Sequence, residues 1–371
     1  MSDDGVQSDA CRAAVRDQLK RLRITVIGGR GRLGRALVAA AYEASGVRVT
    51  VVDVAPVSDA DRQSVRATHV VGDVRDVDAL ERCCAGADLV FLTSALIDLN
   101  PWTPHAARVH DVNVGGAQRT VDAARRCGVR AVVFTSSIDV QMTGAGHGDV
   151  LDGDESWPAF SVAPERHLNQ YSLTKALAEQ LVLAADDPRA LRTAALRPGH
   201  IYAPGDPMIE FAVNLTRTPL LRHFWLVTRG TVHDVIYVEN LAVAHILLAR
   251  TLLARETSAT VAGQAFIVSD DAVNLNDQIA AFFPHGAPRP RFFVPRVVVS
   301  WIACLVELAL YLCSLVGVAP RDATQLFTRF AAFAVTHTLH FRTDKARRAF
   351  GNWTAASRAD ALAIVRRQRG L

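Results

Sequence analysis

The sequence lacks the features that mark several protein classes. None of its six cysteines belongs to a C-x-x-C pair, and no cysteine or histidine cluster has zinc spacing, so we expect no metal site and a reducing compartment. No block of lysine and arginine stands out and the net charge is only +4, which argues against nucleic acid as the main partner. The chain opens without an apolar stretch, so we expect residues 1–22 to be a flexible extension rather than a secretory signal. These absences together predict a protein on the cytoplasmic side that is not secreted.

The most informative stretch is a glycine cluster between an apolar run at 23–27 and a helix-forming run at 35–44. Glycines without a Cβ let the backbone approach a pyrophosphate, and the N-terminus of the following helix favours that anion. A second apolar run ends in Asp53, about 20 residues past the last glycine, where a carboxylate can bind an adenosine ribose. A plain β-α-β turn without a ligand is the alternative, but the glycines together with the acid favour a dinucleotide site. The candidate cofactor residues of this stretch are Gly28, Gly29, Arg30, Gly31, Arg32, Leu33, Gly34 and Asp53.

Helix and strand patterns alternate from residue 23 onward, with apolar strands expected at 88–92 and 129–135. This alternation predicts an α/β fold of the Rossmann type, a doubly wound parallel sheet covered by helices on both faces. We expect residues 23–200 to form mainly the dinucleotide-binding domain. Residues 201–371 would form mainly a smaller substrate lobe, with segments such as 231–270 returning to the sheet.

Further candidates lie where predicted strands end, the edge at which ligands bind to such sheets. Asp73 and Val74 end one strand, and they either lie beside the adenine or cap the next helix. Ser94 follows the strand at 88–92. The segment 143–163 is rich in glycine, aspartate, proline and serine, and we expect a loop there.

Tyr171 and Lys175 lie four residues apart in a helix-forming run, so they share one helix face. An ammonium favours the phenolate, and such a pair can move a proton to or from an alcohol oxygen. Ser137, at the end of the preceding strand, could orient the same oxygen. The spacing alone is equally typical of an ordinary exposed pair, but the serines at the strand end and the glycine turn favour catalysis.

These motifs resemble those of the extended short-chain dehydrogenase/reductases. The motifs are Gly28-x-x-Gly31-x-x-Gly34, Asp53, Asp73-Val74, Asn113, Thr135-Ser136-Ser137 and Tyr171-x-x-x-Lys175. Segments 196–206, 232–245, 263–271, 301–311 and 341–351 are similar to the 3β-hydroxysteroid dehydrogenase/isomerase subgroup. The resemblance covers roughly residues 23–353.

The resemblance implies NAD-dependent oxidation of a 3β-hydroxyl group on a steroid- or sterol-like substrate, with Δ5–Δ4 isomerisation left open. Tyr171 would accept the proton, Lys175 would lower the pKa of Tyr171 and hold the nicotinamide ribose, and Ser137 would position the hydroxyl. The implied cofactor site adds Asp73, Val74, Ser94, Asn113, Lys175, Pro198 and Ile201 to the glycine turn.

Two choices stay open at this point. Arg30 and Arg32 could meet a 2′-phosphate and favour NADP, whereas Asp53 would repel that phosphate, so we expect NAD with NADP as the alternative. The substrate is expected to be a small apolar alcohol or ketone, because the second half of the chain is rich in aromatic residues. A decarboxylating sterol-4α-carboxylate 3-dehydrogenase and an NADP-dependent reductase of another apolar ketone are the alternatives. The Tyr–Lys pair argues against a dinucleotide sensor without activity.

Residues Val297 to Val318 are nearly all apolar, which allows a membrane span, a helix lying on the bilayer, or a buried helix of the substrate lobe. Glu307 near the middle would be costly at the bilayer centre. We expect a membrane-contacting helix that borders the substrate site, with a buried helix as the alternative. A homodimer is a further open alternative.

Overall fold

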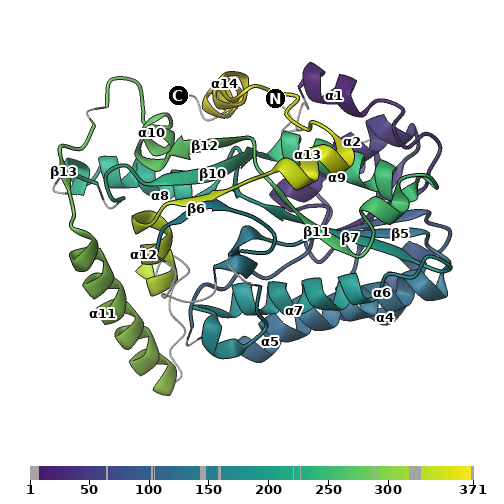
Figure 1. Ribbon diagram of the computed structural model, residues 1–371, viewed down its shortest axis with the longest axis horizontal. Coiled ribbons are helices and arrows are strands. Elements are labelled where there is room, and N and C mark those ends of the chain that lie inside the picture. The colour runs from purple at the N-terminus through teal and green to yellow at the C-terminus, as the bar shows by residue number, and fades with distance from the viewer. Residues whose placement is uncertain are drawn as a thin grey trace.

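The computed structural model describes residues 8–63, 66–101, 103, 105–142, 148–157, 160–219, 221–225, 227–287, 289–316 and 327–368 (Figure 1). Within these ranges a seven-stranded sheet has the order β11-β7-β5-β4-β1-β2-β3. Its strands are β1 (Ile24–Ile27), β2 (Val49–Asp53), β3 (Ala67–Val71), β4 (Leu89–Leu92), β5 (Ala131–Thr135), β7 (Arg192–Pro198) and β11 (Gln264–Val268). Every neighbouring pair is parallel, which confirms the predicted fold class. The strand order reverses between β1 and β4, and a crevice for ligands is expected at their carboxyl ends.

Helices cover both faces of this sheet (Figure 1). The helices of one face are α2 (Arg32–Ser45) and α9 (Val238–Leu253), and those of the other are α4 (Val77–Cys84), α6 (Gly116–Arg126) and α7 (Gln170–Ala184). The short α3 (Asp59–Gln63) follows β2, and α5 (Ala106–His110) continues through a π-helical turn at Asp111–Gly115 into α6. The central strands β1, β4 and β5 are almost entirely apolar because both of their faces are buried under helices.

The N-terminal segment is more ordered than expected. α1 (Asp9–Val15) packs on α2 and α9, and Ser8 caps it by accepting a hydrogen bond from the Cys11 N–H. Cys11, Val15 and Leu19 recur every four residues and are buried in the core. This apolar face covers the outer helices, so the segment carries one short helix that is part of the packed body; residues 1–7 lie outside the described part.

The second half of the chain builds most of a smaller lobe. Its five-stranded sheet contains β6 (Val150–Gly153), β8 (His200–Tyr202), β10 (Val232–Tyr237), β12 (Asp271–Asn274) and β14 (Leu339–Phe341), and β9 (Phe224–Trp225) pairs with β13 (Phe292–Phe293). Its helices are α8 (Pro207–Thr216), α10 (Leu275–Ala280), α11 (Arg296–Leu315), α12 (Arg329–Thr336), α13 (Asp344–Phe350) and α14 (Arg358–Gln368). β6 lies in the segment that was expected to be only a loop. Its partner β14 is distant in sequence, so local sequence gave no indication of the pairing.

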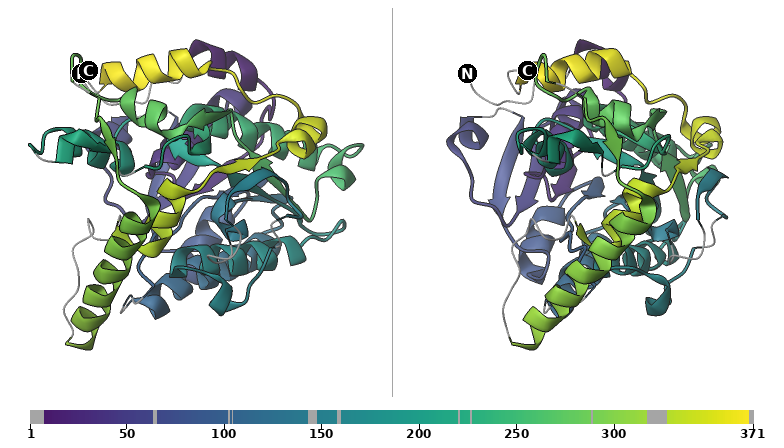
Figure 2. Two further views of the ribbon diagram at one scale, coloured as in Figure 1. Left: turned by 60° about the vertical axis from the view of Figure 1, so that its left-hand side comes forward. Right: turned by 90° about the vertical axis from the view of Figure 1, so that its left-hand side faces the viewer.

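α11 projects from the body of the protein, with one face against α12 (Figure 2). Its buried residues are Ala303, Glu307 and Leu310, which share that face. Most of its other apolar side chains are exposed. The alternative of a buried lobe helix is therefore wrong; residues 317 and 318 of the predicted segment lie outside the described part. Among the described helices, α11 alone is long and apolar enough to cross a membrane by length and composition.

Candidate active site

The turn between β1 and α2 needs glycine for steric reasons. Gly28 has φ +85°, and a Cβ at this position would lie 2.6 Å from the amide nitrogen of Ser94. A Cβ on Gly34 would lie 2.1 Å from the carbonyl oxygen of Gly28. The turn therefore brings the start of α2 against β1 and the loop after β4, which leaves backbone rather than side chains at the edge of the sheet.

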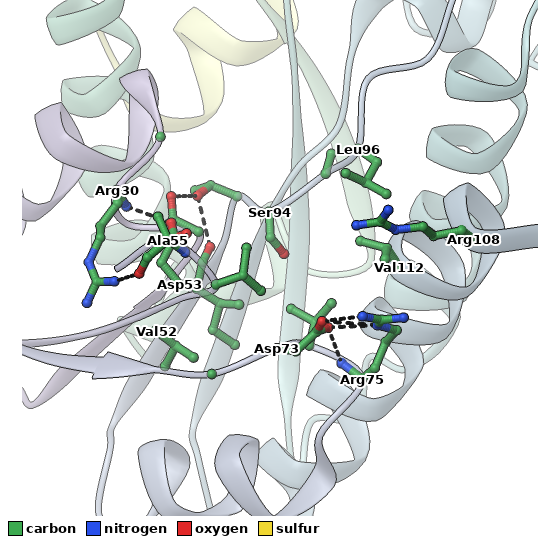
Figure 3. A pocket seen from close by; sticks show the side chains of 18 residues that line it. Arg30, Val52, Asp53, Ala55, Asp73, Arg75, Ser94, Leu96, Arg108 and Val112 are labelled. Carbon is green, nitrogen blue, oxygen red and sulfur yellow. Dashed lines mark hydrogen bonds and ion pairs between the residues drawn. The ribbon is translucent and has the colours of Figure 1, made fainter. Parts of the chain in front are cut away.

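A cavity of about 370 Å³ opens beside this turn, between the ends of β2, β3 and β4 (Figure 3). The predicted cofactor residues that line it are Gly28, Arg30, Gly31, Asp53, Asp73, Val74 and Ser94. Gly29, Arg32, Leu33, Gly34, Asn113, Lys175, Pro198 and Ile201 are not among its lining residues. Arg75 and Arg108 also line it, and sequence reasoning missed both because no motif includes them.

The carboxylate of Asp53 is fixed at the end of β2 by backbone donors. It accepts hydrogen bonds from the Arg30 N–H at 2.9 Å and the Ala55 N–H at 3.0 Å. The Arg30 guanidinium donates to the Ala55 carbonyl and lies 3.9 Å from Asp61, with its side chain buried (Figure 3). A carboxylate has enough acceptor capacity to bind ribose hydroxyls in addition to these donors. Asp53 and Arg30 thus line the same cavity, with the carboxylate held by backbone N–H groups and the guanidinium in contact with Ala55 and Asp61.

Asp73 and Val74 line the same cavity at the end of β3, and each of them has a different environment. Asp73 pairs with Arg75, whose hydrogen bonds hold the pKa of that carboxyl below its usual value. The cap of α4 is Asp76, which accepts from the Ala79 N–H, so the alternative of a capping role for Asp73 is wrong. Val74 is buried against Gly116 and supports the wall of the cavity.

Asn113 connects the cofactor cavity to the helix that carries Tyr171. Its amide exchanges hydrogen bonds with the backbone of Leu96 at 2.7 and 3.0 Å and donates to the Thr174 hydroxyl at 2.9 Å. The Tyr171 N–H donates to the carbonyl of Asp98 in the same loop. The start of α7 is therefore fixed to the loop that borders the cavity, on the carboxyl edge of the sheet. Pro198 ends β7 at this same edge, and Ile201 follows in β8.

Tyr171, Lys175 and Ser137 meet around the end of β5. The ammonium of Lys175 donates to the carbonyl of Thr135 and lies 4.3 Å from the centre of the Phe134 ring. Burial lowers the pKa of Lys175 to about 7, against the opposing charge of Glu179.

The electrostatics of Tyr171 differ from the prediction. Burial and the charge of Asp139 raise the pKa of the phenol above its ordinary value, and hydrogen bonding with Ser137 acts in the opposite direction. The expected lowering of this pKa by Lys175 is therefore not seen. The main reason is the burial of the phenol, to which the charge of Asp139 adds, while Lys175 is directed at the Thr135 carbonyl.

Asp139 is the main residue that sequence reasoning missed. It lies in the 3₁₀ turn Ile138–Gln141, and its N–H donates to the Ser137 hydroxyl at 3.2 Å. His200, to which the sequence assigned no role, lies 3.4 Å from Asp206, and Arg32 reaches Asp206 at 3.5 Å. Only the position two residues after Ser137 could have drawn attention to Asp139.

Comparison with known proteins gives one family for most of the chain. The profile of the 3-beta hydroxysteroid dehydrogenase/isomerase family matches residues 25–281. A 3beta-hydroxysteroid-dehydrogenase/decarboxylase isoform 2 from Arabidopsis thaliana is 30% identical over 297 residues, which are 76% of this chain and 51% of that protein. The sterol-4-alpha-carboxylate 3-dehydrogenase, decarboxylating, of Candida albicans is 31% identical over 67% of this chain and 70% of its own length. The chain thus spans about half the length of the first of these relatives.

Solved structures share the fold at lower identity. The structure of gox2253 superposes with a TM-score of 0.69 at 20% identity, covering 94% of this chain and 98% of that one. MoeE5 in complex with UDP-glucose and NAD gives a TM-score of 0.65 at 21% identity, with the same coverage. These similarities establish the architecture.

Proposed function

Because the chain belongs to the 3-beta hydroxysteroid dehydrogenase/isomerase family, we propose that it oxidises a 3β-hydroxyl group on a steroid- or sterol-like substrate with NAD. One observation carries the proposal within the structure. The side chains of Tyr171, Lys175 and Ser137 gather at the carboxyl edge of the sheet, where the loop after β4 connects them to the cavity beside Asp53. An alcohol bound there would lie between a proton acceptor and a dinucleotide.

The protein's part in this chemistry is to orient the alcohol and to move one proton. Ser137 binds the carbinol oxygen, and Tyr171 takes the hydroxyl proton as the hydride leaves the carbinol carbon. NAD, when bound, supplies the acceptor for that hydride. Burial disfavours the phenolate of Tyr171, so we expect the rate of oxidation to rise as the pH increases. Isomerisation is not part of the proposal.

The expected cofactor preference follows from Asp53 at the end of β2 and from Arg30 in the β1–α2 turn. Asp53 lines the cavity and would repel a 2′-phosphate, while the Arg30 guanidinium is held by Ala55 and Asp61. We expect a Michaelis constant for NAD well below that for NADP. A lower constant for NADP would contradict this assignment.

The direct test is to incubate the protein with NAD and a panel of 3β-hydroxysteroids, and to measure the reduction of NAD by the absorbance of the reduced nicotinamide. Tyr171→Phe removes only the phenolic oxygen and should abolish turnover while NAD binding is retained. Turnover of this variant at the wild-type rate would rule out the proton transfer through Tyr171. Failure of the wild-type protein to reduce NAD with any substrate of the panel would overturn the proposed function.

We also propose that α11 lies on a lipid bilayer. Its exposed apolar residues are Val297, Val298, Trp301, Ile302, Leu305, Leu308, Tyr311, Leu312 and Leu315. Glu307 is turned inward, where it accepts hydrogen bonds from the backbone and side chain of Arg329, so its charge would not enter the lipid. One face of α11 packs on α12, which favours a helix on the bilayer surface over an isolated span.

Co-flotation with liposomes tests this contact. We expect the double variant L305E and L312E to lose flotation, because both side chains are more than half exposed on α11. The matched control is the double variant V54E and L151E, which alters equally exposed apolar residues elsewhere. Flotation unchanged by the α11 variant would contradict the proposal. If the α11 variant instead converts a homodimer to a monomer and leaves flotation unchanged, the exposed face of α11 would be assigned to contact with a second copy of the chain.

A further inference from the structure

Thr135, the last residue of β5, connects helices on the two faces of the sheet through hydrogen bonds. Its hydroxyl lies 2.7 Å from Nε2 of His245 on α9, and Nδ1 of that ring lies 2.8 Å from the Leu241 carbonyl. Its own carbonyl accepts a hydrogen bond from the ammonium of Lys175 on α7. Because α9 and α7 cover opposite faces, these contacts cross the sheet from one helix layer to the other (Figure 1). The proposed chemistry does not use His245, the last residue of the segment 232–245.

The protonation state of His245 follows from its partners. A carbonyl only accepts hydrogen bonds, so Nδ1 carries a proton and donates to Leu241. The ring is fully buried, and this burial lowers the pKa of His245 to about 4 against the opposing effect of the Leu241 carbonyl. The neutral ring then has no proton on Nε2, so the Thr135 hydroxyl donates to that nitrogen. The direction of each hydrogen bond between α9 and Thr135 is therefore fixed.

Thr135 lies where the pairing of β5 ends on one side. Pairing with β4 stops at Phe134, whereas β7 still pairs with Thr135. The ring of Phe134 faces α7, where it lies 4.3 Å from the Lys175 ammonium, so the side chain of Thr135 is directed to the α9 face. On that face it meets His245, whose ring is itself held edge-on against Phe91 of β4. The imidazole thus anchors a residue that β7 alone still pairs within the described sheet.

We propose that His245 is a positioning residue for the proton transfer, because through Thr135 it fixes the end of β5. The inference rests on the proposed function and adds to it a residue that touches neither substrate nor cofactor. Two of the proposed catalytic groups depend on this strand end: Lys175 is bound to the Thr135 carbonyl, and Ser137 follows two residues later. Movement of the strand end would displace both groups from Tyr171, and a displacement of about 1 Å can slow a reaction by about 100-fold.

A purely structural role of the same hydrogen bond would lower stability alone, and Thr25 of β1 provides the comparison. Its hydroxyl donates to the Cys83 carbonyl at the same distance of 2.7 Å, and the residue is also buried. Thr25 lies near the start of its strand, away from the carboxyl edge where the site is. Replacement of either threonine by valine keeps the shape and removes one buried hydroxyl. Both variants should lose thermal stability, but only Thr135→Val should lose activity.

The experiment measures kcat with NAD and the 3β-hydroxysteroid that the wild type oxidises fastest, together with the dissociation constant of ADP and the thermal midpoint. Thr135→Val should lower kcat by at least about tenfold. The dissociation constant of ADP should stay unchanged, because ADP needs only the cavity beside Asp53. Thr135→Ser keeps the hydroxyl and should restore most of the wild-type kcat, and Thr25→Val should retain it.

Three results with these variants would overturn the inference. The first is a wild-type kcat in Thr135→Val, and the second is a Thr135→Ser variant as slow as Thr135→Val. The third is a loss of ADP affinity in Thr135→Val as large as its loss of kcat, which would mean general damage to the fold. Each of these results leaves the dehydrogenase itself intact.

His245 is tested through the same hydrogen bond. His245→Leu should lower kcat to an extent similar to Thr135→Val, and the double variant should be no slower than the slower single variant, because both changes remove one interaction. Losses that multiply in the double variant would contradict the inference. If these variants do not fold, the ring nitrogen shifts of His245 in the NMR spectrum of the wild type decide. They should show a proton on Nδ1 and none on Nε2 at neutral pH, and a proton on Nε2 would overturn the inference. Failure of the wild type to reduce NAD with any steroid would overturn the proposed function together with it.

Discussion

Removing one partner of the buried ion pair between Glu179 and Arg197 should be among the most destabilising single changes at the catalytic end of the sheet. Nε of Arg197 lies 2.9 Å from Oε2 of Glu179, and Nη2 lies 2.5 Å from Oε1. The two side chains are only 6% and 1% exposed. Removal of one partner strands the other as a buried charge, which costs about 3–5 kcal/mol. We therefore expect Arg197→Met to lower the free energy of unfolding by about 3 kcal/mol, the lower end of that range.

The lower end is expected because of Lys345, whose ammonium lies close enough to Glu179 to interact with it. Its amine could replace part of the lost attraction. Glu179→Leu should cost a similar amount, because Arg197 then remains as an uncompensated buried cation. The double variant Glu179→Leu with Arg197→Met removes both charges and should recover most of the stability, since apolar replacements of a buried pair are often neutral or stabilising.

Urea unfolding of the wild type, both single variants and the double variant measures this coupling directly. A coupling energy below about 1 kcal/mol, the value typical of an exposed pair, would refute the reasoning. The pair also has a functional consequence. Glu179 lies on the helix of Tyr171 and Lys175, and Arg197 immediately precedes Pro198, so loss of the pair should lower kcat even where the protein stays folded.

Two further predictions concern stability. Gly34→Ala should destabilise the fold by about 1–3 kcal/mol, because the new Cβ would lie 2.1 Å from the carbonyl oxygen of Gly28. Gly31→Ala is the control and should be tolerated, because its Cβ would have its nearest contact at 3.4 Å. Equal denaturation midpoints for the two variants would contradict this prediction. Burial raises the pKa of Asp270 to about 7, so the folded state holds this proton more tightly than the unfolded chain and stability is lost as the pH rises from about 4 to about 7. Asp270→Asn should therefore gain in thermal midpoint relative to the wild type as the pH increases over this window, and a constant difference between the two would argue against it.

The elements of the central sheet could be predicted because their determinants are local. A strand is expected at 88–92, and its continuous apolar run is Leu89–Leu92, which is β4. The bounds of α4 also have local determinants, because Asp76 caps its start and Gly86 follows its end. β6 escaped prediction because its partner β14 lies almost 200 residues away in sequence, and only that pairing makes it a strand.

The position of the site could be predicted, but its electrostatics could not. The spacing of Tyr171 and Lys175 places both on one face of α7, which is correct. The spacing does not determine where a long side chain ends, and the ammonium of Lys175 lies at the Thr135 carbonyl. The pKa of a buried group depends on burial and on charges from other elements, and the sequence shows neither the burial of Tyr171 nor that the charge of Asp139 acts on it.

The environment of α11 could not be predicted from the sequence either. An apolar run of this length is equally typical of a buried helix and of a helix in lipid, so composition alone could not decide between them. Glu307 counted against the bilayer because a charge in lipid is costly. The structure removes that objection, since the carboxylate accepts a hydrogen bond from the backbone N–H of Arg329 at 2.6 Å on the side that faces α12. A single acid in an apolar helix therefore marks the face that packs on protein, and the exposed remainder of α11 is the part that needs another partner.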